Sequence, residues 1–345
     1  MIDIASFLIN WLTYFAIYAI LAITLNLEAG ISGVINFGKV AFFGLGAYLG
    51  AIMNTYLLLM ISGIDIGVVT PYTAEGVAAL SKITVSNPAL VTGVFMLSVV
   101  ISFIVTGAFG YLLTNPIIRV GAGFVGFTLL CVGEVLRAIY INTGFVGGTY
   151  GMLGIPQPFV WLGNPFLSSA CYLLLVFTVF TSTYVVTYRI ANSPLGRTLR
   201  ALRDDDIAAL CLGKNVPKIK SKIFFLTSAL SGVAGTFYAC YVSSVSPQMF
   251  VTLVTFNLWA MIIIGGRGSP LGAVVGAFLL TLIERVLLFI TPLYGYLPFT
   301  PDYLRPVVIG LIMTSMLIKY PKGLLPEKPP KIVKAMIEEL RGSKG

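Results

Sequence analysis

R-I-A-N-S-P-L-G-R-T-L-R-A-L-R-D-D-D-I-A-A-L-C-L-G-K-N-V-P-K-I-K-S-K, residues 189–222, is the stretch that decides how the rest of this chain is arranged. It holds 8 of the 22 Lys and Arg residues and a run of three Asp, and long apolar stretches lie on both sides of it. Basic residues beside apolar spans collect on the cytosolic side of a membrane. We therefore predict that residues 189–222 form the large cytosolic loop of a membrane-embedded protein, and that another protein contacts this loop.

The composition supports a membrane location. The chain is 57% hydrophobic and 10% charged, and its mean hydropathy is +0.95, whereas soluble domains carry about 25% charged residues. Its apolar runs are about 20 residues long, which is enough for a helix to cross the hydrocarbon core. The strands of a membrane barrel would instead be short and would alternate apolar and polar residues. We predict an all-α polytopic membrane protein.

The apolar runs predict about nine transmembrane helices, within a range of about eight to ten. The basic loop and the basic tail after Lys319 should both be cytosolic. This places the N-terminus outside and the C-terminus in the cytosol. We expect a transmembrane domain over 1–320, which includes the loop 189–222, and a cytosolic tail over 321–345. The expected spans are 5–27, a Gly-rich segment ending near 61, 89–113, 122–141, 167–188, 223–243, 251–264, 271–290 and 304–318.

Two Gly-rich segments, residues 28–51 and residues 265–277, interrupt this pattern. Glycine permits close helix packing and also broken helices, which line substrate pathways in several transporters. The alternative is that membrane helices are simply rich in glycine. The sequence leaves open whether the segments 28–50 and 251–270 are broken or re-entrant.

The basic loop itself predicts two helices. Ser193 can cap a helix that starts at Pro194, and its Arg and Leu residues fall on different faces, so residues 194–203 are predicted to lie on the inner membrane surface. Asp204–Asp206 then suit the N-terminal end of a second helix, which Gly213 ends in a left-handed conformation. Ala208 and Ala209 would give this helix a small face that docks on a partner. The alternative is that the loop only anchors the topology.

Five stretches resemble the branched-chain amino acid ABC permeases of the LivM type, and they occur in the family's order over about residues 20–325. They are N-F-G-K-V-A-F-F-G-L-G-A-Y, G-E-V-L-R with T-G-F-V-G-G-T-Y-G-M-L-G-I-P, A-L-R-D-D-D-I-A-A-L-C-L-G-K-N-V, I-I-G-G-R-G-S-P-L-G-A-V-V-G-A and Y-P-K-G-L-L.

The resemblance implies a subunit of an importer in the prokaryotic plasma (inner) membrane. Such a subunit pairs with a related second permease, as a heterodimer or a homodimer, above two cytosolic ABC ATPases. An extracytoplasmic binding protein delivers the substrate. The implied substrates are branched-chain amino acids, with other amino acids, or urea and short amides, as the alternatives.

The resemblance also identifies residues 204–213 as the counterpart of the coupling motif E-A-A-x-x-x-G, which docks on the ATPase. Ile207 stands where that motif has Glu, and Asp206 comes one place earlier. The predicted ATPase-coupling helix comprises Asp205, Asp206, Ala208, Ala209 and Gly213.

The sequence contains no phosphate-binding loop of the form G-x-x-x-x-G-K-S/T, so the chain should bind no cofactor, and ATP–Mg should bind to partner subunits. The chain has no His, its four Cys are spaced too far apart to form a C-x-x-C pair, and no catalytic dyad stands out. We therefore expect neither a metal site nor an enzyme. The net charge of +9 is explained by topology rather than by nucleic acid. A stand-alone secondary carrier is the remaining alternative, although its usual mid-membrane ionisable groups are few here.

Candidate pathway or gate residues come from the Gly-rich segment, the fourth span and the uncharged loop after it. Glu134 and Arg137 lie on one helix face, and a structural ion pair is the alternative to a role in a gate. Lys39 and Arg267 should extend to the inner membrane interface, and the adjacent Glu284 and Arg285 should find partners on different faces. The candidate residues are Asn36, Phe37, Gly38, Gly44, Glu134, Arg137, Gly147 and Gly148.

Overall fold

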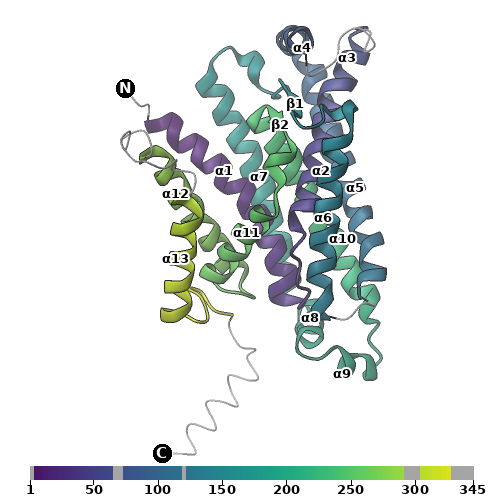
Figure 1. The fold of residues 1–345 in the computed structure, drawn as a ribbon, viewed down its shortest axis with the longest axis vertical. Helices are drawn as coiled ribbons and strands as arrows, with labels where there is room; N and C mark the ends of the chain where they lie inside the picture. Colours follow the sequence, from purple (N-terminus) through teal and green to yellow (C-terminus); the bar gives the residue numbers. More distant parts are fainter. Residues whose placement is uncertain (1–3, 65–72, 119–121, 291–303, 328–345) are drawn as a thin grey trace, which may run out of the picture.

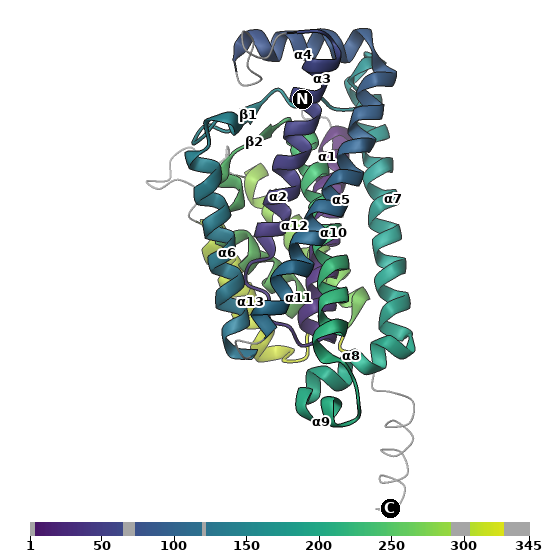
Figure 2. The same cartoon turned by 90° about the vertical axis from the view of Figure 1, so that its right-hand side faces the viewer.

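A computed structural model describes residues 4–64, 73–118, 122–290 and 304–327. Its helices form an elongated bundle (Figures 1 and 2). The α-helices are α1 Ile4–Leu25, α2 Lys39–Ile52, α3 Leu58–Ile61, α4 Ala74–Ser86, α5 Pro88–Ile118, α6 Ala122–Asn142, α7 Pro165–Asn192, α8 Pro194–Asp204, α9 Asp206–Cys211, α10 Val216–Val242, α11 Thr252–Gly265, α12 Pro270–Ile290 and α13 Leu304–Lys319.

Among the described residues, seven helices are long and apolar enough to cross a membrane, and two apolar helices are shorter. The shorter ones, Thr252–Gly265 and Pro306–Lys319, are the spans predicted at 251–264 and 304–318. Every apolar segment predicted from the sequence is therefore helical. Residues 291–303, which separate the last two predicted spans, and the tail beyond 327 lie outside the described residues.

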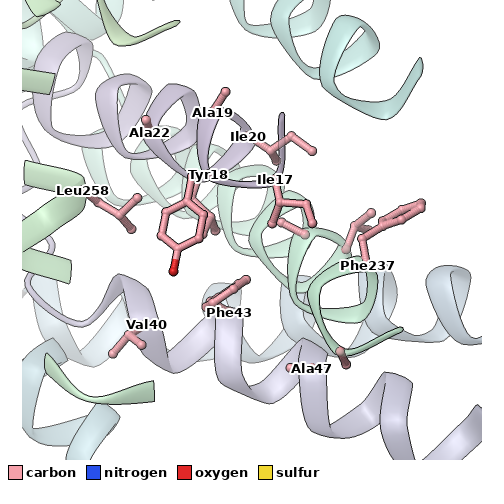
Figure 3. Packing of buried hydrophobic residues seen from close by; sticks show 14 of the residues in the cluster. Ile17, Tyr18, Ala19, Ile20, Ala22, Val40, Phe43, Ala47, Phe237 and Leu258 are labelled. Carbon is pink, nitrogen blue, oxygen red and sulfur yellow. The ribbon is translucent and has the colours of Figure 1, made fainter. Parts of the chain in front are cut away.

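Helix α1 lies at the centre of the bundle. Its residues from Phe15 to Leu25 are buried on all sides, as expected of a helix that is apolar all round. It contacts α7, α10, α11 and α12. Figure 3 shows Ile17, Tyr18 and Ile20 of α1 near Phe43 of α2 and Phe237 of α10. A central helix covered by its neighbours is shielded from lipid, so its packing fixes the positions of the helices around it.

Helices α2 and α10 approach each other closely because glycines meet at their interface. A Cβ on Gly46 would lie 2.0 Å from the Gly232 carbonyl oxygen, and a Cβ on Gly235 would lie 2.1 Å from the Phe43 carbonyl oxygen. Small residues allow this approach in membrane helices. Thr236 adds a hydrogen bond from its hydroxyl to the Gly46 carbonyl at 3.0 Å. The contact holds α2, which follows the break described below, firmly against α10.

The two ends of the molecule differ. One end holds α4 and a two-residue strand pair, β1 Met152–Leu153 with antiparallel β2 Ser244–Val245, and the N-terminal end of α1 lies there too (Figures 1 and 2). The strand pair is absent from the all-α prediction, and α4 lies between the span predicted to end near 61 and the span predicted at 89–113. We call the opposite end, which holds α8 and α9, the loop end.

The first span does not end as a regular helix. After Leu25 the chain continues as a π-helical turn, Asn26–Ile31, and residues 33–36 are then non-helical before α2 begins at Lys39. A second π-helical segment, Met53–Leu57, follows α2. Isolated π-helical turns often mark functional sites. Residues 32–38 of the predicted Gly-rich segment therefore connect two separate spans, Ile4–Ile31 and Lys39–Ile61, and we refer to residues 26–38, the π-helical turn with this connection, as the break.

Candidate functional site

Helix α8 forms where the sequence predicts it. The Ser193 hydroxyl oxygen accepts a hydrogen bond from the Gly196 amide at 3.3 Å, and Pro194 occupies the first turn. Its apolar face, however, is covered by the protein: Leu199 and Leu202 are buried against a cluster that includes Leu27. The prediction that residues 194–203 lie on the membrane surface is wrong, because a neighbouring turn of the same chain offers the apolar contact that lipid would otherwise supply.

Helix α9 also has the predicted ends. The Asp205 carboxylate accepts hydrogen bonds from the Ile207 and Ala208 amides at 2.8 Å and 3.1 Å, which caps the helix. Gly213 ends it with a φ of +73°, a conformation that glycine adopts without strain. The Asp206 carboxylate pairs with the Lys220 ammonium at the start of α10. The two acids therefore hold the loop together from within.

The predicted small face of α9 is not formed. Ala209 is buried, whereas Ala208 is exposed, because adjacent residues of a helix point in directions about 100° apart. The solvent-facing surface is instead apolar and large. Ile207, Leu210 and Leu212 have exposed fractions of 73%, 52% and 79%. We call these three side chains the α9 patch, and such an exposed group is typical of a protein–protein contact.

The break contains a buried ion pair. The Lys39 ammonium lies 2.7 Å from the Glu28 carboxylate, and both side chains are fully buried. Asn36 donates a hydrogen bond to the other Glu28 oxygen at 2.9 Å, and Lys39 also donates to the Thr227 carbonyl at 3.3 Å. The prediction that Lys39 extends to the membrane interface is wrong, because Glu28 provides a partner across the break. The pair joins the end of the first span to the start of the second.

The four predicted pathway residues at and after the break have structural contacts in this conformation. Asn36 is buried, and its carbonyl accepts a hydrogen bond from the Trp259 indole at 3.0 Å. The Phe37 ring lies 5.4 Å from the Trp259 ring, while Gly38 adjoins Leu129 and Gly44 adjoins Phe250. These contacts join the break to α6 and α11. The pathway role of the four residues stays a prediction.

The remaining predicted residues lie further towards the α4 end. The Glu134 carboxylate pairs with the Arg137 guanidinium at 2.8 Å and accepts a hydrogen bond from Thr252 at 2.7 Å, which links α6 to the start of α11. Gly147 and Gly148 have positive φ in the loop between α6 and β1. The predicted pathway residues are therefore spread along the molecule rather than gathered in one cavity.

Two neighbouring cavities share Tyr14 and Tyr238, and sequence reasoning did not identify these tyrosines. One cavity, of about 430 Å³, includes Arg285, whose guanidinium carbon lies 4.1 Å from the centre of the Tyr14 ring. The other, of about 360 Å³, includes Glu284, which accepts a hydrogen bond from Asn257 at 3.2 Å. Glu284 and Arg285 do have different partners, as their positions on α12 predict.

Arginines connect the loop end to the break. Arg203 of α8 donates a hydrogen bond to the Gly30 carbonyl at 2.5 Å, and Arg267, from the turn between α11 and α12, donates to the Ala29 carbonyl at 2.8 Å. Burial lowers the pKa of Arg203, but the hydrogen bond and charge of Glu327 outweigh it, so that the pKa is raised. Burial, followed by the charge of Arg203, lowers the pKa of Arg267. The two arginines therefore lie close together beside the break.

The fold and this arrangement define a class of protein: a polytopic helical membrane protein with a glycine-containing break between its first two spans and an exposed apolar surface at one end. Comparison with known proteins identifies the family. The family model described as "Branched-chain amino acid transport system / permease component" matches residues 7–317. This chain belongs to that family, and it is a multi-pass integral protein of the prokaryotic inner membrane.

Three relatives illustrate the range of the family. The chain is 29% identical to a probable branched-chain amino acid transport permease protein LivM of Methanocaldococcus jannaschii, over 98% of both chains. It is 28% identical to the high-affinity LivM permease of Escherichia coli, over 92% of this chain and 69% of the relative. It is 25% identical to the ribose import permease protein RbsC of Haemophilus influenzae, over 83% and 87%. No solved structure matches this chain.

Sequence reasoning missed Arg203 and Glu327 as partners and gave Glu28 no role. An acid and a base 11 residues apart on the two sides of a Gly-rich stretch could have suggested the Glu28–Lys39 pair. No local pattern joins Arg203 to Glu327, which are 124 residues apart.

Proposed function

We propose that this chain is the membrane-spanning subunit of an ATP-binding-cassette importer for branched-chain amino acids. The observation that carries the proposal is the α9 patch, an apolar surface on a capped helix between α8 and α10, in a chain of the permease family. A chain without a phosphate-binding loop needs an external source of energy. ATPase subunits bound at the patch would supply it.

The proposed orientation has the N-terminus outside and the C-terminus in the cytosol. Seven long and two shorter apolar helices among the described residues would give an odd number of crossings. The basic loop lies at the end of the bundle away from the start of α1 (Figure 1), which agrees with the positive-inside rule. The proposed partners are a related second permease, two cytosolic ABC ATPases carrying ATP–Mg, and an extracytoplasmic binding protein.

The proposed mechanism is alternating access. ATP binding closes the ATPase pair and moves the docking helices, by which we mean α9 of each of the two permease subunits. The movement reaches the transmembrane helices through the packing beneath α8 and α9. Leu199, Leu202 and Ala209 belong to one buried cluster with Leu27 and Ile31 of the break. A close-packed cluster transmits displacement rather than absorbing it. The first span would therefore be displaced when the docking helices move.

The test is reconstitution of the chain with its partner permease, ATPases and binding protein in proteoliposomes. Uptake of labelled leucine should require ATP and the ATPases, and unlabelled isoleucine and valine should compete while urea and ribose should not. Competition by urea or ribose alone would reassign the substrate. Leucine accumulation by this chain alone under an ion gradient would replace the importer with a secondary carrier.

A further inference from the structure

Arg203 contacts the break directly. Its Nη1 atom donates hydrogen bonds to the Gly30 carbonyl at 2.5 Å and to the Glu327 carboxylate at 2.8 Å. Gly30 belongs to the π-helical turn Asn26–Ile31, where the regular helical hydrogen-bond ladder is interrupted. A side chain of α8 thus binds the backbone of the first span at the point where its helix changes geometry.

The surroundings of Arg203 are shaped by glycine. Gly33 has a φ of +74°, and a Cβ there would lie 2.9 Å from the Arg203 Cα, so the backbone of the break lies against α8. A Cβ on Gly268 would lie 2.6 Å from the Glu327 carboxylate and 3.4 Å from the Arg203 guanidinium. Any larger side chain at either position would displace the Arg203–Glu327 pair or α8 itself.

Glu327 is held in place by a strap, by which we mean residues 320–327 after α13. The strap pairs with the end of α11: the Leu324 amide donates to the Ile264 carbonyl at 3.0 Å, and the Leu325 amide donates to the Gly265 carbonyl at 2.8 Å. The Glu327 carboxylate then pairs with both Arg200 and Arg203 of α8. The strap therefore connects the end of α11 to the same arginine that binds the break.

We propose that Arg203 carries the movement of α8 and α9 to the break between the first two spans, and that Glu327 is a positioning residue that holds the Arg203 guanidinium in place. The proposal rests on the importer function proposed above. A planar guanidinium suits the role because its donors point in fixed directions and can bind a carboxylate and a carbonyl at once. When α8 moves, Gly30 has to move with it or lose its hydrogen bond.

Arg267 also binds the break, but it belongs to a different part of the chain from Arg203. Arg267 donates hydrogen bonds to the adjacent Ala29 carbonyl. It lies in the turn between α11 and α12, outside the basic loop 189–222. The break is therefore bound by Arg203 from α8 and by Arg267 from the turn between α11 and α12. Only the first would move directly with α8.

The test compares Arg203→Gln with Arg197→Gln in the fully assembled complex in proteoliposomes. Arg197 lies on the same helix and is exposed, so its variant removes the same charge without touching the break. ATP hydrolysis and initial leucine uptake are measured on the same vesicles. We expect Arg203→Gln to lower the leucine taken up per ATP by about fivefold or more, as typical coupling energies imply, and to assemble normally. Arg197→Gln should keep the wild-type ratio.

Four further variants separate coupling from general stability. Arg203→Lys keeps the positive charge but loses the planar guanidinium with its fixed donor directions. Its ratio of leucine taken up to ATP hydrolysed should therefore lie between those of wild type and Arg203→Gln. Glu327→Gln should lower the ratio, and Glu327→Asp should restore part of it, with ATP hydrolysis retained in both. The double variant of Arg203→Gln with Glu327→Gln should lose less than the sum of the two single losses, because both single variants remove the same Arg203–Glu327 contact, although Glu327 also pairs with Arg200.

Equal ratios for Arg203→Gln and Arg197→Gln overturn the proposal. If Arg203→Gln fails to assemble, wild-type ratios in both Arg203→Lys and Glu327→Gln overturn it instead. A wild-type complex that takes up no leucine with ATP refutes the importer function itself, and is thereby distinguished from a failure of the Arg203 proposal alone.

Discussion

Replacing Lys39 by Met should destabilise the chain more than replacing both members of the buried ion pair. At the observed 2.7 Å separation, an effective dielectric constant of about 20 gives an attraction of about 6 kcal/mol between unit charges. Desolvation costs several kcal/mol per ion and offsets that attraction, so the intact pair contributes little net stability. Its importance appears when one partner is removed.

In Lys39→Met, Glu28 keeps its hydrogen bond from Asn36 but loses its counter-charge. Breaking a buried pair in this way costs about 3–5 kcal/mol. At roughly 2 °C per kcal/mol for a large chain, the apparent Tm should fall by about 6–10 °C. Glu28→Gln combined with Lys39→Met leaves no buried charge and should recover most of that loss.

The assay is thermal unfolding of the purified chain in detergent at a fixed heating rate, because membrane proteins often unfold irreversibly and apparent Tm values depend on the scan rate. Lys218→Met serves as the control, since Lys218 is exposed at the start of α10. A Lys39→Met variant as stable as this control, or a double variant as unstable as Lys39→Met, would refute the reasoning.

Three further predictions concern the basic loop and the break. Gly213→Val should insert normally but uncouple ATP hydrolysis from uptake, because a β-branched residue at φ +73° is strained and shifts the end of α9; normal uptake in proteoliposomes would contradict the docking role. Leu212→Asp should abolish co-purification of the ATPase from native membranes, whereas Lys214→Asp, at an exposed neighbouring position, should retain it; equal recovery from both variants would remove the α9 patch as the contact. Gly33→Ala should cost about 1–3 kcal/mol through left-handed strain and contact with Arg203, which thermal unfolding measures against Gly93→Ala, where a Cβ would meet open space.

The basic loop, residues 189–222, shows what local rules can predict. Ser193, Pro194, Asp205 and Gly213 start and end helices through contacts within a few residues, so their roles follow from sequence spacing. The burial of α8 could not be predicted in this way, because its apolar partners in the break are more than 150 positions earlier in the chain. The amphipathic pattern is the same whether lipid or protein covers the apolar face.

The ion pair in the break illustrates the same kind of error. The sequence places Lys39 beside a predicted span end, where a lysine usually extends to the interface. The π-helical turn and the non-helical residues after it reverse the chain, so that Glu28 meets Lys39 inside the bundle. The predicted apolar segments are helical, because a run of about 20 apolar residues has few other solutions in a bilayer.

The roles of Asp205 and Asp206 in the basic loop have a consequence for how the proposed ATPase is recognised. Asp205 caps α9 and Asp206 pairs with Lys220, so the loop's own structure uses their charges. The surface left at the α9 patch is uncharged and apolar. Contacts between exposed charges are screened by added salt, whereas apolar contacts are not. We therefore expect the ATPase to stay bound through a wash at 1 M ionic strength, where the Debye length is about 3 Å, and its release in that wash would show that attraction between charges holds it instead.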